Sequence, residues 1–287
     1  MTLTAMTFTT LISTDELESR LLDPRLVLLD ARFSLDDEAW GTRAYDESHI
    51  PGALRADLSD DLSGQVIDGV TGRRPFPEPE AFARQLSAWG IDSTTQVVVY
   101  DADRGLMAAA RVWVMLRWLG HDAVAVLDGG LTAWLAEGRP MTADTEHATP
   151  SAFVPRVREG ILASIDEVDV ARVDPAHRVF DSRSEEGYHG LGKYYDPVKG
   201  HIAGAGLAER TQVLADDGRF LPTADLRAHF DSLIGQTPPG QVIFYCGSGV
   251  TAAENLLAMA HAGLGDARMY VGSWSEWILD PERPIEL

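Results

Sequence analysis

The sequence predicts an α/β fold in two tandem domains, each a mainly parallel sheet flanked by helices. Three observations lead to this prediction. Four stretches of the first half of the 287-residue chain recur in the same order in the second half, so the chain contains two copies of one unit. Each copy has a continuous apolar run typical of strands buried on both faces. A helical spacing of apolar residues follows each run.

The repeated stretches give the order of elements in both copies. The pairs are "VLLDARF" (27–33) with "RVFDSRS" (178–184), "SHIPGA" (48–53) with "GHIAGA" (200–205), "QVVVYDADRG" (96–105) with "QVIFYCGSGV" (241–250), and "VLDGGLTAWLAEGRP" (126–140) with "MYVGSWSEWILDPERP" (269–284). A polar stretch punctuated by prolines separates the copies, which indicates a linker. We therefore expect a first domain over residues 1–143, a linker over 144–158 and a second domain over 159–287.

The apolar runs at 97–100 and 242–245 are predicted to be strands of parallel sheets. A helix is predicted after each run, because apolar residues recur there at helical spacing. They are Ala109, Val112, Trp113, Leu116 and Leu119 in the first copy, and Leu256, Leu257, Met259 and Ala260 in the second.

Composition narrows the classes of function. The formal net charge is -20, which disfavours nucleic acid as a partner, and an anionic small substrate would need a local cluster of arginines. The single cysteine can form no intramolecular disulfide, and we expect no metal site. We expect a cytoplasmic protein, monomer or homodimer. The N-terminus lacks a secretory leader pattern and no apolar stretch approaches a membrane span.

The only cysteine, Cys246, stands where a buried strand ends and a glycine-rich loop leads into a helix beginning near Thr251. Backbone N–H groups of such a loop point inward and, with the helix dipole, form an anion cradle. The pKa of a cysteine there should be depressed, which favours the nucleophilic thiolate or a persulfide. The alternative is a small buried residue that only packs. The first copy has Asp101 at this position, so it cannot perform thiolate chemistry.

Two other motif interpretations are weaker. The stretch "GSGVTA" fits a dinucleotide-binding fingerprint, but the chain ends too soon after the next strand, and that strand is not followed by an acidic residue. A cysteine phosphatase would use a similar loop closed by an arginine, whereas "CGSGVT" contains no cation.

The combination of "CGSGVT" after a buried strand, two "HI-x-GA" boxes, two "D-x-R" strand ends and the terminal "GSWSEW" resembles the tandem-domain rhodanese-like sulfurtransferases, the thiosulfate/3-mercaptopyruvate sulfurtransferase family. The resemblance spans about Thr14 to Pro284. It implies a duplicated rhodanese fold with an inactive first domain and a catalytic second one. It also implies a reaction in which Cys246 takes a sulfane sulfur from a small anionic donor and passes it to a thiophilic acceptor such as cyanide or a thiol, without a cofactor.

The resemblance also implies roles for residues of the site. Cys246 would be the nucleophile, Ser248 would polarise the transferring sulfur and Arg183 would anchor the donor. Asp181 would be an orienting or structural residue and not a catalyst. His49 and His201 occupy equivalent places in the repeat, each before an isoleucine, which suggests that both stabilise a turn. The cradle would be formed by the amides from Gly247 to Thr251, including Gly249 and Val250.

Departures from the family pattern leave the sulfur donor open. The loop is similar to that of mercaptopyruvate enzymes, yet Gly187 and His189 flank Tyr188 where relatives usually have arginines. Arg74 falls near the place of a histidine that those enzymes use with the loop serine, which favours thiosulfate over mercaptopyruvate, with Arg74 as a donor-binding cation. The missing arginines also allow a second hypothesis: a sulfur carrier or regulatory module that accepts persulfide from a partner protein without turning over small donors.

Overall fold

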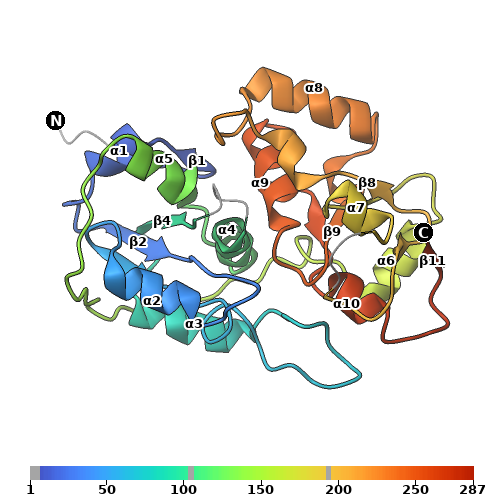
Figure 1. Ribbon diagram of the computed structural model, residues 1–287, viewed down its shortest axis with the longest axis horizontal. Helices are drawn as coiled ribbons and strands as arrows, with labels where there is room; N and C mark the ends of the chain where they lie inside the picture. Colours follow the sequence, from blue (N-terminus) through green and yellow to red (C-terminus); the bar gives the residue numbers. More distant parts are fainter. Residues whose placement is uncertain (1–6, 103–106, 192–194) are drawn as a thin grey trace.

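Each copy of the repeat folds around its own parallel sheet, which confirms the predicted α/β class (Figure 1). The computed structural model describes residues 7–102, 107–191 and 195–287. In the first copy the strand order is β1-β5-β4-β2-β3, with every pair parallel. Its elements are β1 (Leu11–Ile12), α1 (Thr14–Glu18), β2 (Leu26–Asp30), α2 (Trp40–Glu47), β3 (Ala53–Arg55), α3 (Pro79–Ala88), β4 (Gln96–Tyr100), α4 (Ala108–Trp118), β5 (Val124–Leu127) and α5 (Gly130–Ala136).

The second copy repeats this arrangement in the order β10-β9-β6-β8, again with parallel pairs. A separate antiparallel pair joins β7 to β11. The elements are α6 (Ile165–Ala171), β6 (Arg178–Asp181), α7 (Glu185–Tyr188), β7 (His201–Ile202), β8 (Gly206–Leu207), the 3₁₀ turns η1 (Arg210–Val213) and η2 (Pro239–Gln241), α8 (Thr223–Ile234), β9 (Val242–Tyr245), α9 (Ala253–His261), β10 (Arg268–Met269), α10 (Ser273–Trp277) and β11 (Ile285–Glu286).

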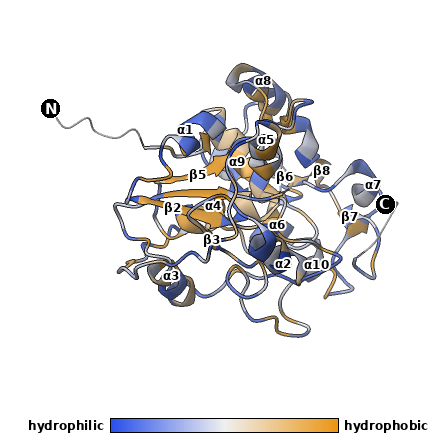
Figure 2. Cartoon of the chain, turned by 60° about the vertical axis from the view of Figure 1, so that its left-hand side comes forward, coloured by the Kyte–Doolittle hydropathy of each residue, from blue (hydrophilic) through white to orange (hydrophobic). Residues whose placement is uncertain are grey.

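Local sequence signals start equivalent helices in the two copies. Ser13 begins α1 and Ser164 begins α6, and each serine forms a reciprocal capping box with a glutamate three residues later. The predicted strands and helices also appear where expected, since β4, β9, α4 and α9 contain the apolar runs and the periodic residues, except that Leu119 lies one residue beyond α4. Orange, apolar strands such as β2 and β5 lie inside a shell of mixed or polar helix surfaces (Figure 2).

The repeat extends to side-chain contacts around the strand ends. The hydroxyl of Tyr245 accepts the N–H of Ile202, just as the hydroxyl of Tyr100 accepts the N–H of Ile50. His49 stacks on Tyr45 and donates Nδ1–H to its backbone carbonyl. His201 stacks on Tyr188 and donates to the carbonyl of Tyr188 in the same way. Both histidines therefore hold a turn, away from the cysteine loop.

The two copies pack against each other mainly through α4 and α9 (Figure 1). Val112 and Leu116 of α4 belong to the same cluster of buried apolar side chains as Leu256 and Leu257 of α9. Residues 143–158 form no helix or strand. They are fastened to the first copy, because the N–H of Phe153 donates to the Ser87 hydroxyl.

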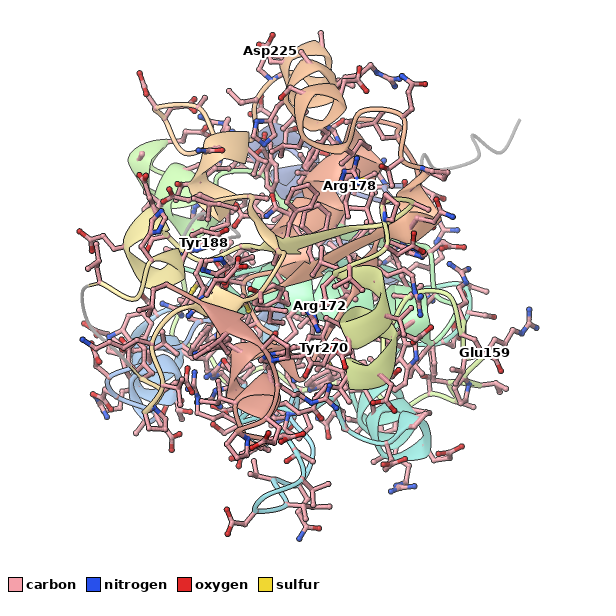
Figure 3. All side chains as sticks on the ribbon, turned by 90° about the vertical axis from the view of Figure 1, so that its right-hand side faces the viewer. Glu159, Arg172, Arg178, Tyr188, Asp225 and Tyr270 are labelled. Atoms are coloured by element: carbon pink, nitrogen blue, oxygen red, sulfur yellow. The ribbon has the colours of Figure 1, made fainter. Side chains whose placement is uncertain are left out.

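Charged side chains cover the outer surface. Glu159, Arg178 and Asp225 are exposed on the second copy, whereas Tyr270 is buried (Figure 3). Among the described residues, none of the helices has the length and apolar character that a bilayer crossing requires.

Candidate active site around Cys246

The loop between β9 and α9 holds Cys246 at the carboxyl end of β9. Cys246 is 2% exposed. The backbone N–H of Cys246 donates to the hydroxyl of Ser273, the one described residue other than glycine with a positive φ, at 55°. Gly249 has a φ of 76°, and a Cβ there would collide with the carbonyl oxygen of Val271. The loop therefore needs glycine at 249 to close around the sulfur.

Hydrogen bonds around the Cys246 sulfur favour the thiolate. Burial raises the pKa of Cys246, but the hydroxyl of Thr251 and the amides of Ser248, Ala252 and Val250 all donate to the sulfur. Their combined effect outweighs burial, and the pKa is lowered from its ordinary value. The sulfur thus lies in an anion cradle of the kind that the strand-to-helix loop predicts, and its donors extend to the amide of Ala252.

The lowered pKa predicts fast alkylation of the native protein at a pH where a free cysteine reacts slowly. Cys246 is the only cysteine, so iodoacetamide labelling reports on it alone. We expect the pH midpoint of the alkylation rate to be lower in the native chain than in the same chain unfolded in urea, because only the folded loop presents the donors to the thiolate. Equal midpoints, or a higher native midpoint, would show that burial dominates.

The equivalent loop of the first copy contains its own anion. Asp101 is 1% exposed, and its Oδ2 accepts the N–H groups of Met107 at 3.2 Å and Ala109 at 3.0 Å. A carboxylate thus stands where the second copy has a thiol. Residues 103–106 of this loop lie outside the described residues.

A cavity of about 260 Å³ opens on Cys246 and gathers most of the residues predicted for the site. Its lining includes Gly247, Ser248, Val250, Thr251 and Arg183, together with three charged residues that sequence reasoning did not select, Arg73, Glu209 and Arg210. Gly249 does not line the cavity; its carbonyl points to the first copy and accepts Nη1–H of Arg111 at 2.6 Å.

Arg183 combines a structural contact with an open donor group. Its Nε and Nη2 donate to the fully buried carboxylate of Asp181, and Nη2 also donates to the carbonyl of Gly200. Arg32 makes the same pattern with Asp30 and the carbonyl of Ser48 in the first copy. Nη1 of Arg183 has no hydrogen-bond partner within the described part of the chain, which leaves it available to a ligand in the cavity.

The two consecutive arginines after Gly72 lie in different places. Arg73 lines the cavity of Cys246 and pairs with Asp196, and its backbone N–H donates to Ser275 of the second copy. Arg74 donates to Ser59 and lines an adjoining cavity that also contains Ser248. Arg73 thus lines the cavity of Cys246, whereas Arg74, for which the sequence predicted the donor-binding role, lines only the adjoining cavity, which both arginines share with Ser248.

Arg210 of η1 supplies a further cation to the cavity. Its Nη1 lies 3.8 Å from Oε2 of Glu254, whose side chain is fully buried in α9. His189, in contrast, does not line the cavity but packs edge-on against Tyr188. The only sequence signal for Arg210 was its place a few residues after the repeated "GHIAGA" stretch.

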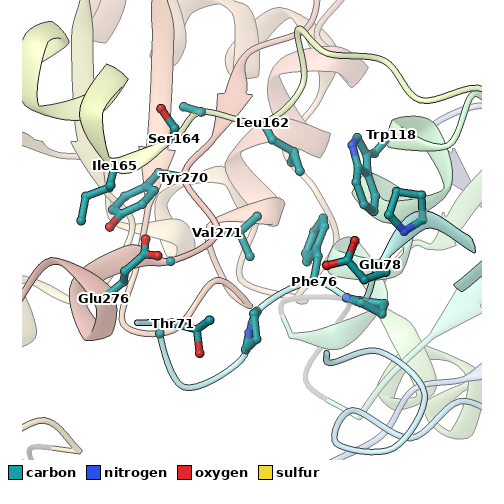
Figure 4. A pocket seen from close by; sticks show the side chains of 16 residues that line it. Thr71, Phe76, Glu78, Trp118, Leu162, Ser164, Ile165, Tyr270, Val271 and Glu276 are labelled. Carbon is teal, nitrogen blue, oxygen red and sulfur yellow. The ribbon is translucent and has the colours of Figure 1, made fainter. Parts of the chain in front are cut away.

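A larger cavity, of about 400 Å³, lies elsewhere between the two copies (Figure 4). The Tyr270 hydroxyl and the Glu276 carboxylate lie close together on one side of it, and Phe76 and Trp118 form the opposite side. Burial raises the pKa of Glu276. Among the described residues this cavity has no cysteine and no basic side chain in its lining, so it does not suit an anionic sulfur donor. Nowhere in the described ranges do three His, Cys, Asp or Glu side chains gather as metal ligands.

Comparisons with known proteins agree with the repeat. The family model of the Rhodanese-like domain matches residues 13–137 and again residues 164–280. The chain is 44% identical over 276 residues to a protein of Pseudomonas aeruginosa named "Probable 3-mercaptopyruvate sulfurtransferase", covering 96% of this chain and 97% of that one. It is 33% identical over 269 residues to a thiosulfate sulfurtransferase of Cricetulus griseus, covering 92% and 88%. The solved 3-mercaptopyruvate sulfurtransferase from Leishmania major matches with a TM-score of 0.82 at 29% identity, covering 94% of this chain and 74% of that chain.

Proposed function

The chain belongs to the rhodanese-like sulfurtransferase family, with two tandem domains, and from this premise we propose that it moves a sulfane sulfur from thiosulfate to a thiophilic acceptor through Cys246. The second domain performs the chemistry, because it contains the only thiol. The first domain supports the site from across the interface.

The proposed reaction has two halves. The Cys246 thiolate attacks the outer sulfur of thiosulfate; a new S–S bond forms, the S–S bond of the donor breaks and sulfite leaves with the electron pair. Cyanide or a thiol then attacks the outer sulfur of the persulfide, and the thiolate is regenerated. Splitting the transfer in this way replaces one difficult step by two easier ones. The amides of the loop favour both the thiolate and the persulfide anion, and Ser248 polarises the transferring sulfur.

The main support for an anionic donor is that Arg73, Arg183 and Arg210 line the same cavity as the Cys246 sulfur. The protein as a whole has a net charge of -20. Without such a cluster the overall field would repel a dianion. The described lining of this cavity, and of the adjoining one at Ser248, includes no histidine that could act as a base for the serine. These features favour thiosulfate over 3-mercaptopyruvate. The same arginines provide cations where the neighbours of Tyr188 do not, which weakens the reason for a carrier without turnover.

The donor preference should depend on Arg73. We expect Arg73→Ala to lower the ratio of kcat/KM for thiosulfate to that for 3-mercaptopyruvate about 5- to 10-fold, because a dianion loses more from a missing cation than a monocarboxylate does. The measurement uses cyanide as the common acceptor for both donors.

Arg74→Ala is the matched control, since it removes the same charge one residue away. Its side chain faces Ser59 and the adjoining cavity, so the ratio should change less. A larger change in Arg74→Ala than in Arg73→Ala would return the donor-binding role to Arg74. Sulfur loading from a protein partner alone, with no saturable turnover of either donor, would favour the carrier hypothesis.

A further inference from the structure

Arg111 is a fully buried cation at the interface of the two domains, and it does not line the donor cavity. It lies in α4, a helix that is buried along almost its whole length, and its side chain has an exposed fraction of 0%. The guanidinium stacks on the ring of Phe76, with its carbon 4.6 Å from the ring centroid. A charge in this position needs specific partners, because burial without them is costly.

Carbonyl groups from both domains surround the guanidinium. Nε and Nη2 donate to the carbonyl of Leu62, and Nη2 also donates to that of Pro75. Nη1 donates to the carbonyl of Arg74 at 3.0 Å and to that of Gly249 at 2.6 Å. Within the described ranges no carboxylate accepts a hydrogen bond from Arg111. One guanidinium thus ties the loop of the first domain to the cysteine loop of the second.

The contact with Gly249 acts on a peptide group that also faces the sulfur. The Gly249 carbonyl and the Val250 N–H belong to the same planar, trans peptide, so they point in opposite directions. Arg111 holds the carbonyl on one side, and the Val250 N–H donates to the Cys246 sulfur on the other. A hydrogen bond from a cation to the carbonyl polarises the peptide and strengthens its N–H as a donor.

The charges of Arg111 and Cys246 also favour an interaction between the two groups. Burial lowers the pKa of Arg111, the negative charge of Cys246 raises it and Arg74 lowers it, so that the resulting pKa is about 9. Arg111 still carries its charge at neutral pH. The thiolate is thus the anion that stabilises this cation, and the stabilisation is mutual because both groups are buried.

We propose that Arg111 is a positioning residue of the sulfur transfer: by holding the Gly249 carbonyl it aims the Val250 N–H at the sulfur and stabilises the thiolate and the persulfide. This inference rests on the proposed role of Cys246. It gives the first domain a direct part in the chemistry of the second, although the first domain has no thiol. Arg111 does not line the donor cavity, so its loss should affect kcat more than the KM of the donor.

The test is the pH profile of Cys246 alkylation by iodoacetamide in the full chain. We expect Arg111→Met to raise the pH midpoint by about one unit and to slow alkylation at neutral pH about tenfold. Arg111→Lys keeps a positive charge but loses the guanidinium fork, so we expect a smaller rise. Arg73, Arg183, Arg210 and Glu209 face the thiol from the cavity and remain in both variants.

Arg117→Met is the matched control on the same helix. Arg117 also crosses the interface, where it pairs with Asp266, but it has no contact with the cysteine loop. The pH midpoint of alkylation in Arg117→Met should equal that of the protein without substitutions. Urea unfolding of each variant separates a loss of stability from a change in the thiol.

A folded Arg111→Met variant with an unchanged alkylation profile and unchanged kcat would overturn the proposal and leave Arg111 a purely structural residue. If Arg111→Met does not fold, the test is made with Arg111→Lys: an unchanged alkylation profile and an unchanged kcat in that variant would overturn the proposal. Alkylation needs no sulfur donor, so a shifted profile in a protein that fails to turn over thiosulfate would reject the proposed donor and keep the role of Arg111.

Discussion

We expect a Cys246→Ser variant to take up no sulfane sulfur from thiosulfate and to transfer none to cyanide. The variant keeps the shape of the loop but replaces a thiolate by a hydroxyl, which stays protonated at neutral pH and cannot form a persulfide. No other residue can substitute, because the chain has a single cysteine. Intact mass after incubation with the donor measures the outcome directly, as the gain of one sulfur atom.

Asp101→Asn is the control from the other copy of the repeat. The asparagine keeps a carbonyl oxygen for the amides of Met107 and Ala109, whereas alanine would leave two buried donors without an acceptor. Sulfur loading should persist in this variant. A Cys246→Ser protein that still gains one sulfur would refute the assignment of the nucleophile.

We expect an Arg183→Ala variant to lose about 10- to 100-fold in kcat/KM for the sulfur donor, with much less change in the kinetics of the acceptor. The physical reason is the open Nη1 group in the cavity of Cys246: a charge-assisted hydrogen bond to an anion contributes about 1.5–3 kcal/mol. Steady-state kinetics with thiosulfate as the varied substrate measure the loss.

The ion pair of Arg183 with buried Asp181 means that this variant also loses stability. Arg32→Ala provides the matched control, because Arg32 pairs with buried Asp30 in the same geometry and does not line the cavity of Cys246. Both variants should unfold at lower urea, but only Arg183→Ala should weaken donor use. Equal losses of donor kcat/KM in the two variants would assign Arg183 a structural role alone.

Most of the fold and the position of Cys246 could be predicted from the sequence. The two parallel sheets follow from the repeated apolar runs, and the place of Cys246 follows from the strand, the two glycines and the helix around it. The residues that form each of these signals lie close together in the sequence, so they can be recognised without knowledge of the fold. The lowered pKa of Cys246 agrees with the expectation for such a loop.

Contacts that depend on the meeting of the two domains were not predictable in this way. Nothing in the sequence decides whether Arg73 or Arg74 turns toward the thiol, because that depends on how the loop of the first domain lies against Ser275. Arg111 was also missed. A signal existed: the stretch "AAARVWVMLRW" is apolar on nearly all sides, so an arginine within it must be buried and must find partners. Its partners come from residues 49 positions earlier and 138 positions later.

The shared core between α4 and α9 makes the two domains one cooperative unit in unfolding. Apolar side chains from both helices form a single cluster, so neither domain can open without exposing the other's core. Free energy of unfolding that is lost in the first domain is therefore lost by the second domain as well. A substitution in the core of the first domain should therefore destabilise the fold around Cys246 as well, although it lies far from the thiol.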